Sequence, residues 1–386
     1  MEKIEEIEIL RAVAILLTLT QHLGHLFCPT KAVWAAVNKN QPFWGGVDLF
    51  FCISGFVICK SLVKSWPPAS WRHHWADTWK FWVRRVFRIV PTLWVWIMLF
   101  LLGTLFFNDA GGFGALTPNL NDARAAVLNY SNAHIFLCVI GKSSCGPNPV
   151  YWSLSLEEQF YLLLPLLLLL PVRFIQVLVV GLILAQLPIH RMPWDQSLGG
   201  ALWFFRTDAM LLGVVLAYLS TTSFYAEANR RIERLRPYRG PISILLIFAL
   251  FGFPRSGFSA QAGGIAIVSS CLVFLASFDR GFLFGQSRWL KPIVWIGSRS
   301  FSIYLMHIPL YYFVNELAFR ISGHSAAYRA PLSDNPFHPV TALLTFAVIF
   351  AAAECNYRLI ETPLRKLGRK LTERDKPTGF GNATAT

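Results

Sequence analysis

The sequence predicts an all-α integral membrane protein with about ten transmembrane helices, and its composition carries this prediction. Hydrophobic residues make up 54% of the 386 residues, charged residues make up only 15%, and the mean hydropathy is +0.47. A soluble protein carries about 25% charged residues, so this chain lacks the polar residues to cover a soluble core. The 14 Trp and 32 Phe fit repeated membrane crossing, because aromatic side chains gather at membrane interfaces. Disordered, collagen-like and disulfide-stapled proteins are excluded.

The predicted helices follow from a search for mostly apolar segments that approach the length of about 20 residues needed to cross a membrane. The first segment follows the acidic stretch 1–8 and precedes no small-residue cleavage site, so we expect a retained helix rather than a signal peptide. The ten predicted segments, of which the fifth, seventh and eighth are the shortest, are 9–27, 43–63, 86–107, 150–170, 174–187, 201–219, 241–253, 263–277, 293–319 and 340–360.

The charge distribution predicts that both termini are cytoplasmic. With the N-terminus inside, the inner segments carry 24 of the 35 Lys and Arg residues, whereas the outer loops carry eight. Residues 1–370 are therefore predicted to form a transmembrane domain, and the polar residues 371–386 to form a disordered cytoplasmic tail. The net charge of +14 also suits an anionic ligand or lipid headgroup, although cytoplasmic anchoring accounts for most of the basic residues and no nucleic-acid partner is expected.

The cysteines do not indicate a metal site. The chain has seven Cys but no Cys-x-x-Cys pair, so neither a zinc site nor a thioredoxin-like site is predicted. The longest outer loop, 108–149, carries Cys138 and Cys145, which could form a disulfide in an oxidising exterior. The sequence leaves open whether these two residues are bonded.

Ionisable residues inside the predicted helices indicate a structural or functional role, because inserting each into the membrane costs roughly 2.5–3.5 kcal/mol. Arg11 and His22 lie in the first segment, about three helical turns and roughly 16 Å apart on one face. Alone, Arg11 could extend to the inner headgroups, and His22 could be a packed core residue. Together on one face, they favour a polar path through the bundle.

The fourth segment carries three polar residues at a spacing of four. Ser153, Glu157 and Tyr161 therefore share one helix face. Glu157 could form a structural pair with an Arg, or it could orient a catalytic His. In the second segment, Asp48 also needs a partner, for which an intramembrane Arg is suitable.

Further polar residues lie at similar predicted depths, which favours a chamber within the bundle. Arg206 and Asp208 belong to the sixth segment, and Tyr304 and His307 share a face of the ninth. At the cytoplasmic mouth of the third segment, Arg85 and Arg88 are one turn apart. Guanidinium groups bind phosphate bidentately, so this pair predicts a phosphate site, with positive-inside anchoring as the alternative.

Taken together, these motifs resemble the type-3 family of membrane-bound acyltransferases, over about residues 7–365. The resemblance implies transfer of an acyl group, usually acetyl, from acyl-CoA supplied by the cytoplasm to a hydroxyl group of a glycan or lipid-linked saccharide, in the bacterial plasma membrane. It implies acyl-CoA as a co-substrate and no permanently bound cofactor. The motifs are Arg11 with ten residues before His22, Gly46-Val47-Asp48 through Ser54-Gly55-Phe56, Arg85-x-x-Arg88, Ser153-x-x-x-Glu157-x-x-x-Tyr161, Arg206-x-Asp208, Ser302-x-Tyr304-Leu305-x-His307, and Glu361-x-Pro363.

Spacing and resemblance together give a hypothesis for the site. His22 is the expected general base, and Glu157 is expected to hold its tautomer. Ser153, Tyr161 and Tyr304 are expected to stabilise the oxyanion. Two further roles are expected. Coenzyme A binding is assigned to Arg11, Arg85 and Arg88, and substrate binding to Asp48, Arg206, Asp208, Tyr304 and His307.

Two other functions stay open at this point. The same polar path would serve a transporter of an acylated or anionic molecule, although no inverted repeat is visible. An acyltransferase acting on a cytoplasmic small molecule would carry the same residues. The sequence also does not specify the acceptor, the acyl length, the oligomeric state, or whether transfer is direct or proceeds through an acyl-enzyme.

Overall fold

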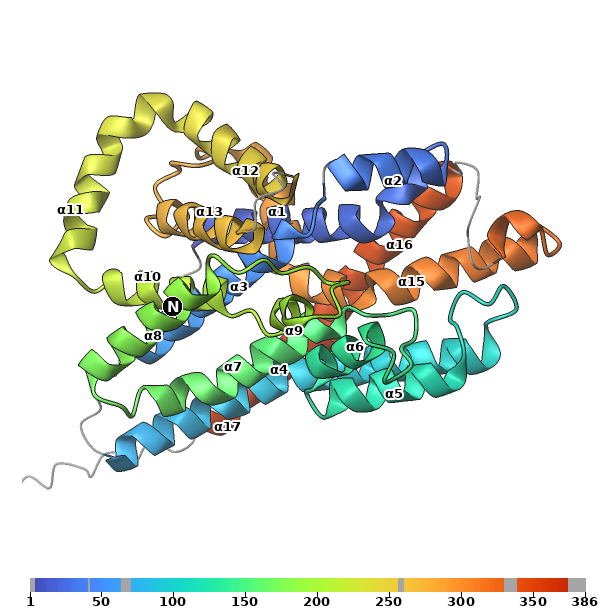
Figure 1. Cartoon of the computed structure of the whole chain (residues 1–386), viewed down its shortest axis with the longest axis horizontal. Coiled ribbons are helices and arrows are strands. Elements are labelled where there is room, and N and C mark those ends of the chain that lie inside the picture. Colours follow the sequence, from blue (N-terminus) through green and yellow to red (C-terminus); the bar gives the residue numbers. More distant parts are fainter. Residues whose placement is uncertain (1–3, 41, 64–70, 256–259, 330–338, 374–386) are drawn as a thin grey trace, which may run out of the picture.

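The helical class is confirmed by the computed structural model, which describes residues 4–40, 42–63, 71–255, 260–329 and 339–373 (Figure 1). The structure is 80% helical, and no strand occurs among these residues. The helices are α1 (Glu5–Leu23), η1 (Gly24–Phe27), α2 (Lys31–Asn40), α3 (Gly45–Val63), α4 (Trp71–Phe106), α5 (Leu116–Val127), α6 (Ser131–Val139), α7 (Tyr151–Leu167), α8 (Val172–Gln186), α9 (Leu198–Phe204), α10 (Asp208–Leu219), α11 (Ser223–Ile232), η2 (Glu233–Tyr238), α12 (Arg239–Arg255), α13 (Gln261–Ala276), η3 (Arg288–Leu290), α14 (Lys291–Ser298), α15 (Ser300–Ile321), η4 (Ala326–Tyr328), α16 (Pro339–Asn356), η5 (Tyr357–Glu361) and α17 (Thr362–Glu373).

Four helical stretches of the described structure are long and apolar enough to cross a membrane. They are Glu5–Phe27, Gly45–Leu62, Trp71–Phe106 and Pro339–Glu373, and a fifth is added if α9 and α10 form one bent span. Membrane character is therefore confirmed. The count of ten crossings and the cytoplasmic position of both termini stay predictions.

The predicted sixth segment is broken where a charged residue interrupts it. Helices α9 and α10 meet at 45°, with Arg206 in the non-helical connection. Side chains satisfy the backbone groups that the break releases, as a low-dielectric environment requires. Arg206 Nη1 donates to the Trp203 carbonyl at 3.0 Å, and Gln186 Oε1, at the end of α8, accepts from the Thr207 amide at 2.9 Å.

The predicted ninth segment also consists of two helices, α14 and α15, which are separated at Arg299. The guanidinium of Arg299 donates through Nε to Glu354 Oε2 of α16 at 2.8 Å. Trp295 Nε1 donates to the same carboxylate oxygen at 2.9 Å. The break is thereby tied to the neighbouring helix α16.

Helices α3 and α10 pack closely because each presents a glycine to the other's backbone. A Cβ atom on Gly55 would lie 2.1 Å from the Met210 carbonyl oxygen, and one on Gly213 would lie 2.3 Å from the Cys52 carbonyl oxygen. Small residues at such crossings let helix backbones approach within van der Waals contact. Gly55 and Gly213 thus set the close approach of α3 and α10.

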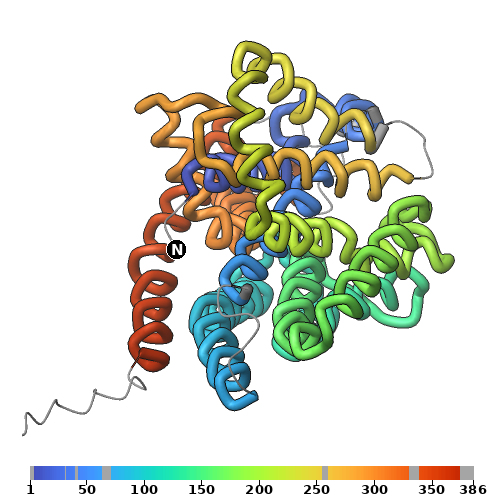
Figure 2. Tube along the Cα trace, turned by 90° about the vertical axis from the view of Figure 1, so that its left-hand side faces the viewer, coloured from blue at the N-terminus to red at the C-terminus, as the bar shows by residue number. Residues whose placement is uncertain are grey.

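Several basic residues lie toward one end of the molecule. In Figure 1, the start of α4 lies with α11 and α17 toward the left end, and α5 lies with the end of α15 toward the right. Viewed onto the left end in Figure 2, α17 lies beside the first turns of α4, with which it is in contact. We call this left end the basic end, because it carries Lys80, Arg84 and Arg369.

The first three residues of the predicted tail are helical. Residues 371–373 belong to α17, and Thr372 is buried and accepts a hydrogen bond from Arg84 Nε at 2.7 Å. The rest of the predicted tail, 374–386, lies outside the described residues.

Gly55→Ala should destabilise the protein, because the new methyl group would push against the backbone of α10. Overpacking of a close contact typically costs about 1–3 kcal/mol. We expect a lower Tm for the purified protein in detergent, measured by intrinsic fluorescence. Gly181→Ala is the matched control, since a Cβ at Gly181 meets no atom within 4 Å. Equal Tm values for the two variants would contradict the packing role.

Candidate active site

A polar cavity lies in the bundle, and seven of the twelve predicted site residues line it. We call it the central cavity; its free volume is about 90 Å³. Helices α1, α3, α4, α7 and α15 contribute its walls. The seven predicted residues are Arg11, Arg85, Arg88, Ser153, Glu157, Tyr161 and Tyr304, and the other polar lining residues are Ser54 and Ser300.

Glu157 is the acceptor at the centre of a small hydrogen-bond network. Ser54 Oγ donates to its Oε1 at 2.9 Å, and Tyr161 Oη donates to its Oε2 at 2.8 Å. The Arg85 guanidinium lies 5.1 Å from the centre of the Tyr161 ring. The carboxylate is therefore satisfied by two hydroxyl groups, while a cation rests on the same tyrosine.

Two hydroxyl groups that line the central cavity, those of Ser153 and Tyr304, lie side by side. Tyr304 Oη donates to the Val150 carbonyl at 2.8 Å. Ser153 Oγ lies 2.6 Å from Tyr304 Oη and 3.5 Å from the same carbonyl, so its proton is engaged with one of these two acceptors. The hydroxyl protons of Ser153, Tyr161 and Tyr304 are thus all engaged, and the predicted oxyanion role requires release of one of these hydrogen bonds.

A pair of histidines lies next to Tyr304. His307 Nδ1 is 2.8 Å from the Tyr304 carbonyl, and its Nε2 is 2.9 Å from His22 Nδ1. A carbonyl oxygen only accepts, so His307 Nδ1 carries the proton and His307 Nε2 accepts one from His22. Neutral His22 then has its lone pair on Nε2, for which the described residues offer no hydrogen-bond partner.

The role predicted for Glu157 is thereby corrected. We expected Glu157 to fix the tautomer of His22, but its two oxygens accept from Ser54 and Tyr161. His307, predicted to bind substrate, is the residue that contacts His22 Nδ1. The predicted carboxylate–imidazole pair is replaced by a pair of imidazoles.

The three basic residues of the central cavity differ in their contacts. Arg11 Nη1 donates to Glu8 Oε1 at 2.8 Å, one turn earlier on α1. Arg85 rests on the rings of Phe81 and Tyr161, and the structure gives it no carboxylate partner among the described residues. Arg88 lines the central cavity and two further pockets. These side chains can present positive charge to a ligand.

Three residues predicted to bind substrate are buried in ion pairs instead. Asp48 accepts from Arg206 Nε and Nη2 at 2.8 and 2.9 Å, and Asp208 accepts from Arg191 Nη2 at 2.6 Å. All four side chains are 0% exposed, and none lines the central cavity. The predicted Arg partner of Asp48 is confirmed, whereas direct contact of Asp48, Arg206 and Asp208 with substrate does not fit their burial.

Aromatic rings complete the environment of Arg206. Its guanidinium carbon lies 3.9 Å from the centre of the Trp203 ring and 5.0 Å from that of Trp152. A desolvated guanidinium gains from such ring faces as well as from its carboxylate. Arg206 thus joins α3, α7 and α9.

Sequence reasoning missed two partners. Arg191 lies between two predicted segments, yet it is 1% exposed and binds Asp208. Ser54 was given no place in the predicted site, yet it donates to Glu157. For Ser54, the available signal was its place in the same motif as Asp48; for Arg191, the sequence carries no comparable signal.

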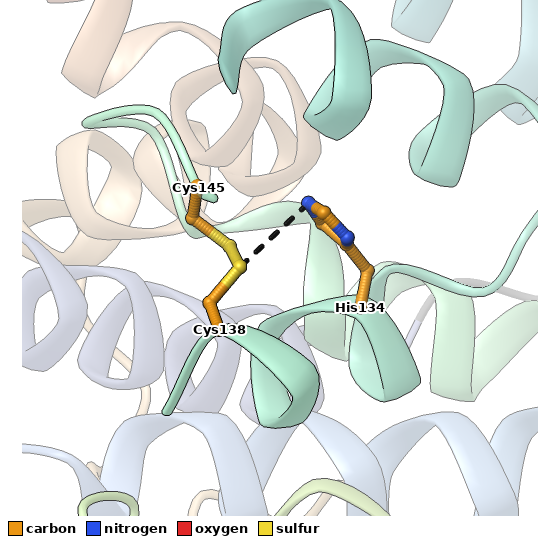
Figure 3. Close-up of side chains that lie close together, drawn as sticks. All are labelled: His134, Cys138 and Cys145. Carbon is orange, nitrogen blue, oxygen red and sulfur yellow. Dashed lines mark hydrogen bonds between the residues drawn. A yellow bond between two sulfur atoms is a disulfide. The ribbon is translucent and has the colours of Figure 1, made fainter. Parts of the chain in front are cut away.

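One group of His and Cys side chains lies close enough to hold a metal ion, namely His134, Cys138 and Cys145 (Figure 3). Cys138 and Cys145 form a disulfide, so neither sulfur is available as a thiolate ligand. His134 Nε2 instead lies 2.9 Å from Asp122 Oδ1, and Asp122 Oδ2 accepts from the Gly146 amide at 2.9 Å. The group therefore fits a cross-linked loop on α5 and α6 rather than a metal site.

Comparisons with known proteins find similarity to acyltransferases. The model of a family described as an acyltransferase domain matches residues 4–354. The O-acetyltransferase OatA of Staphylococcus aureus is 29% identical over 345 residues, which are 84% of this chain and 53% of that protein. The peptidoglycan O-acetyltransferase OatA of Listeria monocytogenes is 27% identical over 385 residues, which are 95% of this chain and 56% of that protein. The chain thus spans about half the length of these curated relatives. No solved structure matches it.

Asp48→Asn should destabilise the protein strongly, because it leaves Arg206 buried without a counter-charge. Breaking a buried pair on one side costs about 3–5 kcal/mol, whereas replacing both partners by apolar residues is often neutral. We expect a large fall in Tm for Asp48→Asn and recovery in the double variant Asp48→Leu/Arg206→Met. An unchanged Tm for Asp48→Asn would argue against a structural pair. A stable double variant that has lost substrate binding would restore the predicted binding role.

Proposed function

The chain belongs to the family of the acyltransferase domain, and from this premise we propose that it transfers an acyl group, most simply acetyl, from cytoplasmic acyl-CoA to a hydroxyl group of an envelope glycan or lipid-linked saccharide. The observation that carries the proposal is the hydrogen-bonded series His22–His307–Tyr304, which lies at the end of a cavity lined by arginines. Such a series leaves a basic nitrogen on His22 beside a route for an anionic donor.

The donor is proposed to enter from the basic end. The positive-inside rule favours a cytoplasmic position for this end, in the plasma membrane of a bacterium. Arg85 and Arg88 line the mouth of the central cavity on this side. Their guanidinium groups suit the phosphates of coenzyme A, while the narrow central cavity suits its neutral thioester arm.

The proposed chemical step is general-base catalysis by His22. His22 Nε2 takes the proton of the acceptor hydroxyl as that oxygen attacks the thioester carbonyl carbon. The carbon–sulfur bond then breaks, and the thiolate receives the proton from His22 and leaves as the coenzyme A thiol. Positioned general-base catalysis contributes about 10²–10⁴-fold to such rates.

Tyr304 and Ser153 lie between the central cavity and the histidine pair. The Tyr304 and His307 ring centres are 5.8 Å apart, and those of His307 and His22 are 5.1 Å apart. In the proposed mechanism, the thioester passes the Ser153–Tyr304 hydrogen bond to reach His22. Release of that bond would also free a hydroxyl proton for the oxyanion.

A glycan acceptor is proposed from the names of the relatives, one of which is a peptidoglycan O-acetyltransferase. This choice agrees with the position of His22 at the far side of the central cavity from the basic end. The acceptor would then approach from the exterior and the donor from the cytoplasm.

His22→Ala should abolish acyl transfer while leaving the protein folded. The experiment incubates purified protein with radiolabelled acetyl-CoA and isolated cell-envelope glycan, and it measures label in the glycan. We expect a loss of at least about 100-fold, because the general base is removed. His190→Ala, which changes an exposed histidine away from the cavity, is the matched control. Near-normal activity of His22→Ala would refute the assignment of the base.

His307→Leu should lower kcat about 10–100-fold and leave the KM for acetyl-CoA unchanged. The physical reason is that His307 fixes the tautomer of His22 but does not line the central cavity. His307→Gln retains one donor and one acceptor, so we expect it to recover part of kcat. A rise in KM without loss of kcat would show that His307 binds donor instead.

A further inference from the structure

A second, larger pocket opens from the basic end and adjoins the central cavity. We call it the basic pocket; its volume is about 570 Å³, within the range of roughly 300–1,000 Å³ typical of small-molecule sites. Helices α4 and α17 supply most of its walls. Its charged lining residues are Lys80, Arg84, Arg85, Arg88, Arg365 and Arg369, with Asp77 and Glu373.

The excess of positive charge in the basic pocket indicates an anionic ligand. Six cationic side chains face two carboxylates across one concave surface, which concentrates the electrostatic field. Lys80 and Arg369 make no ion pair among the described residues. Positive charges that are held together in excess of their counter-charges lower the free energy of a bound polyanion such as a set of phosphates.

Two of these arginines are held in place by the protein. Arg84 Nε donates to Thr372 Oγ1 of α17 at 2.7 Å, and Arg365 Nη1 donates to Glu361 Oε1 at 3.2 Å. Helix α17 also lies very close to α4, since a Cβ on Gly368 would be 2.7 Å from the Phe87 Cβ. The two walls of the basic pocket are therefore fixed relative to each other before a ligand binds.

The basic pocket and the central cavity share Arg85 and Arg88. A ligand that spans both would place a broad, multiply charged end among the arginines and a thin, uncharged end toward Glu157 and Tyr304. Acyl-CoA has this form, because its nucleotide carries three phosphate groups and its acylated arm carries none. Helix α17 lies outside the match to the family model, which ends at residue 354.

We propose that α17 completes the donor site, with Arg369 and Arg365 binding the phosphates of the nucleotide half of acyl-CoA opposite Lys80 and Arg84. This proposal rests on the proposed use of an acyl-CoA donor. It adds to the Arg85–Arg88 pair a second wall of the phosphate site, supplied by a helix that the family model does not include.

The test compares the full-length variant Arg369→Gln with Lys366→Gln, which removes an exposed charge from the same helix outside the basic pocket. Binding of coenzyme A and of adenosine 3′,5′-bisphosphate to protein in phosphatidylcholine nanodiscs is measured by calorimetry. We expect Arg369→Gln to weaken both ligands about ten-fold, because one charged contact is lost, and Lys366→Gln to leave both within two-fold. The KM for S-acetylpantetheine, which lacks the nucleotide phosphates, should be unchanged.

A second variant, on α4, and nanodiscs of anionic lipid provide two further measurements. Lys80→Gln, on the opposite wall, should reproduce the effect of Arg369→Gln even if the latter has a lowered Tm. If both variants bind coenzyme A within two-fold of the wild-type affinity, the proposed role of α17 is wrong, while the proposed acyl-CoA donor still stands. If the variants no longer retain anionic lipid in phosphatidylglycerol nanodiscs but still bind coenzyme A like the wild type, the basic pocket binds lipid headgroups instead. No coenzyme A binding by the wild-type protein would overturn the proposed function itself.

Discussion

Charged side chains in the apolar interior of this protein must be matched by partners, and this constraint organises much of the structure. The Asp48–Arg206 pair has no exposed surface and is joined by two hydrogen bonds, so it fixes α3 against the break between α9 and α10. Glu354 ties Arg299, at the other break, to α16. Desolvated pairs of this kind are costly to disrupt on one side, which makes them strong determinants of relative helix position. The central cavity lies among helices that these contacts hold.

Composition and hydropathy predict the helical membrane class because they depend only on which residues are present. The same averages conceal the breaks at Arg206 and Arg299, since one charged residue barely changes the mean over a whole segment. Residues 108–149 were expected to form a loop, yet they contain α5 and α6. The His134–Asp122 contact joins these two short helices, and the Cys138–Cys145 disulfide ties α6 to the loop that follows it. Such tertiary support is not visible in local hydropathy.

The site was predictable where its residues share one helix. The spacing of Ser153, Glu157 and Tyr161 follows from helix geometry, and all three line the central cavity. Partners on different helices were not predictable in this way. The contact of His22 with His307 joins residues 285 positions apart, and spacing along α1 or α15 says nothing about it. A carboxylate was therefore assigned to a role that a second imidazole fills.

Arg88 borders three cavities of the described structure, namely the central cavity, the basic pocket and a third that Lys60 and Glu361 also line. One guanidinium offers a limited set of donors, so ligands in adjoining cavities draw on the same positive charge. Thermodynamic linkage then requires the effect on affinity to be mutual. An anion bound in one cavity lowers the affinity of a second anion for another cavity by the same factor by which the second lowers the affinity of the first. The position of this one side chain thus couples the three cavities. Occupancy of one changes the ligand affinity of the others without any movement of the helices.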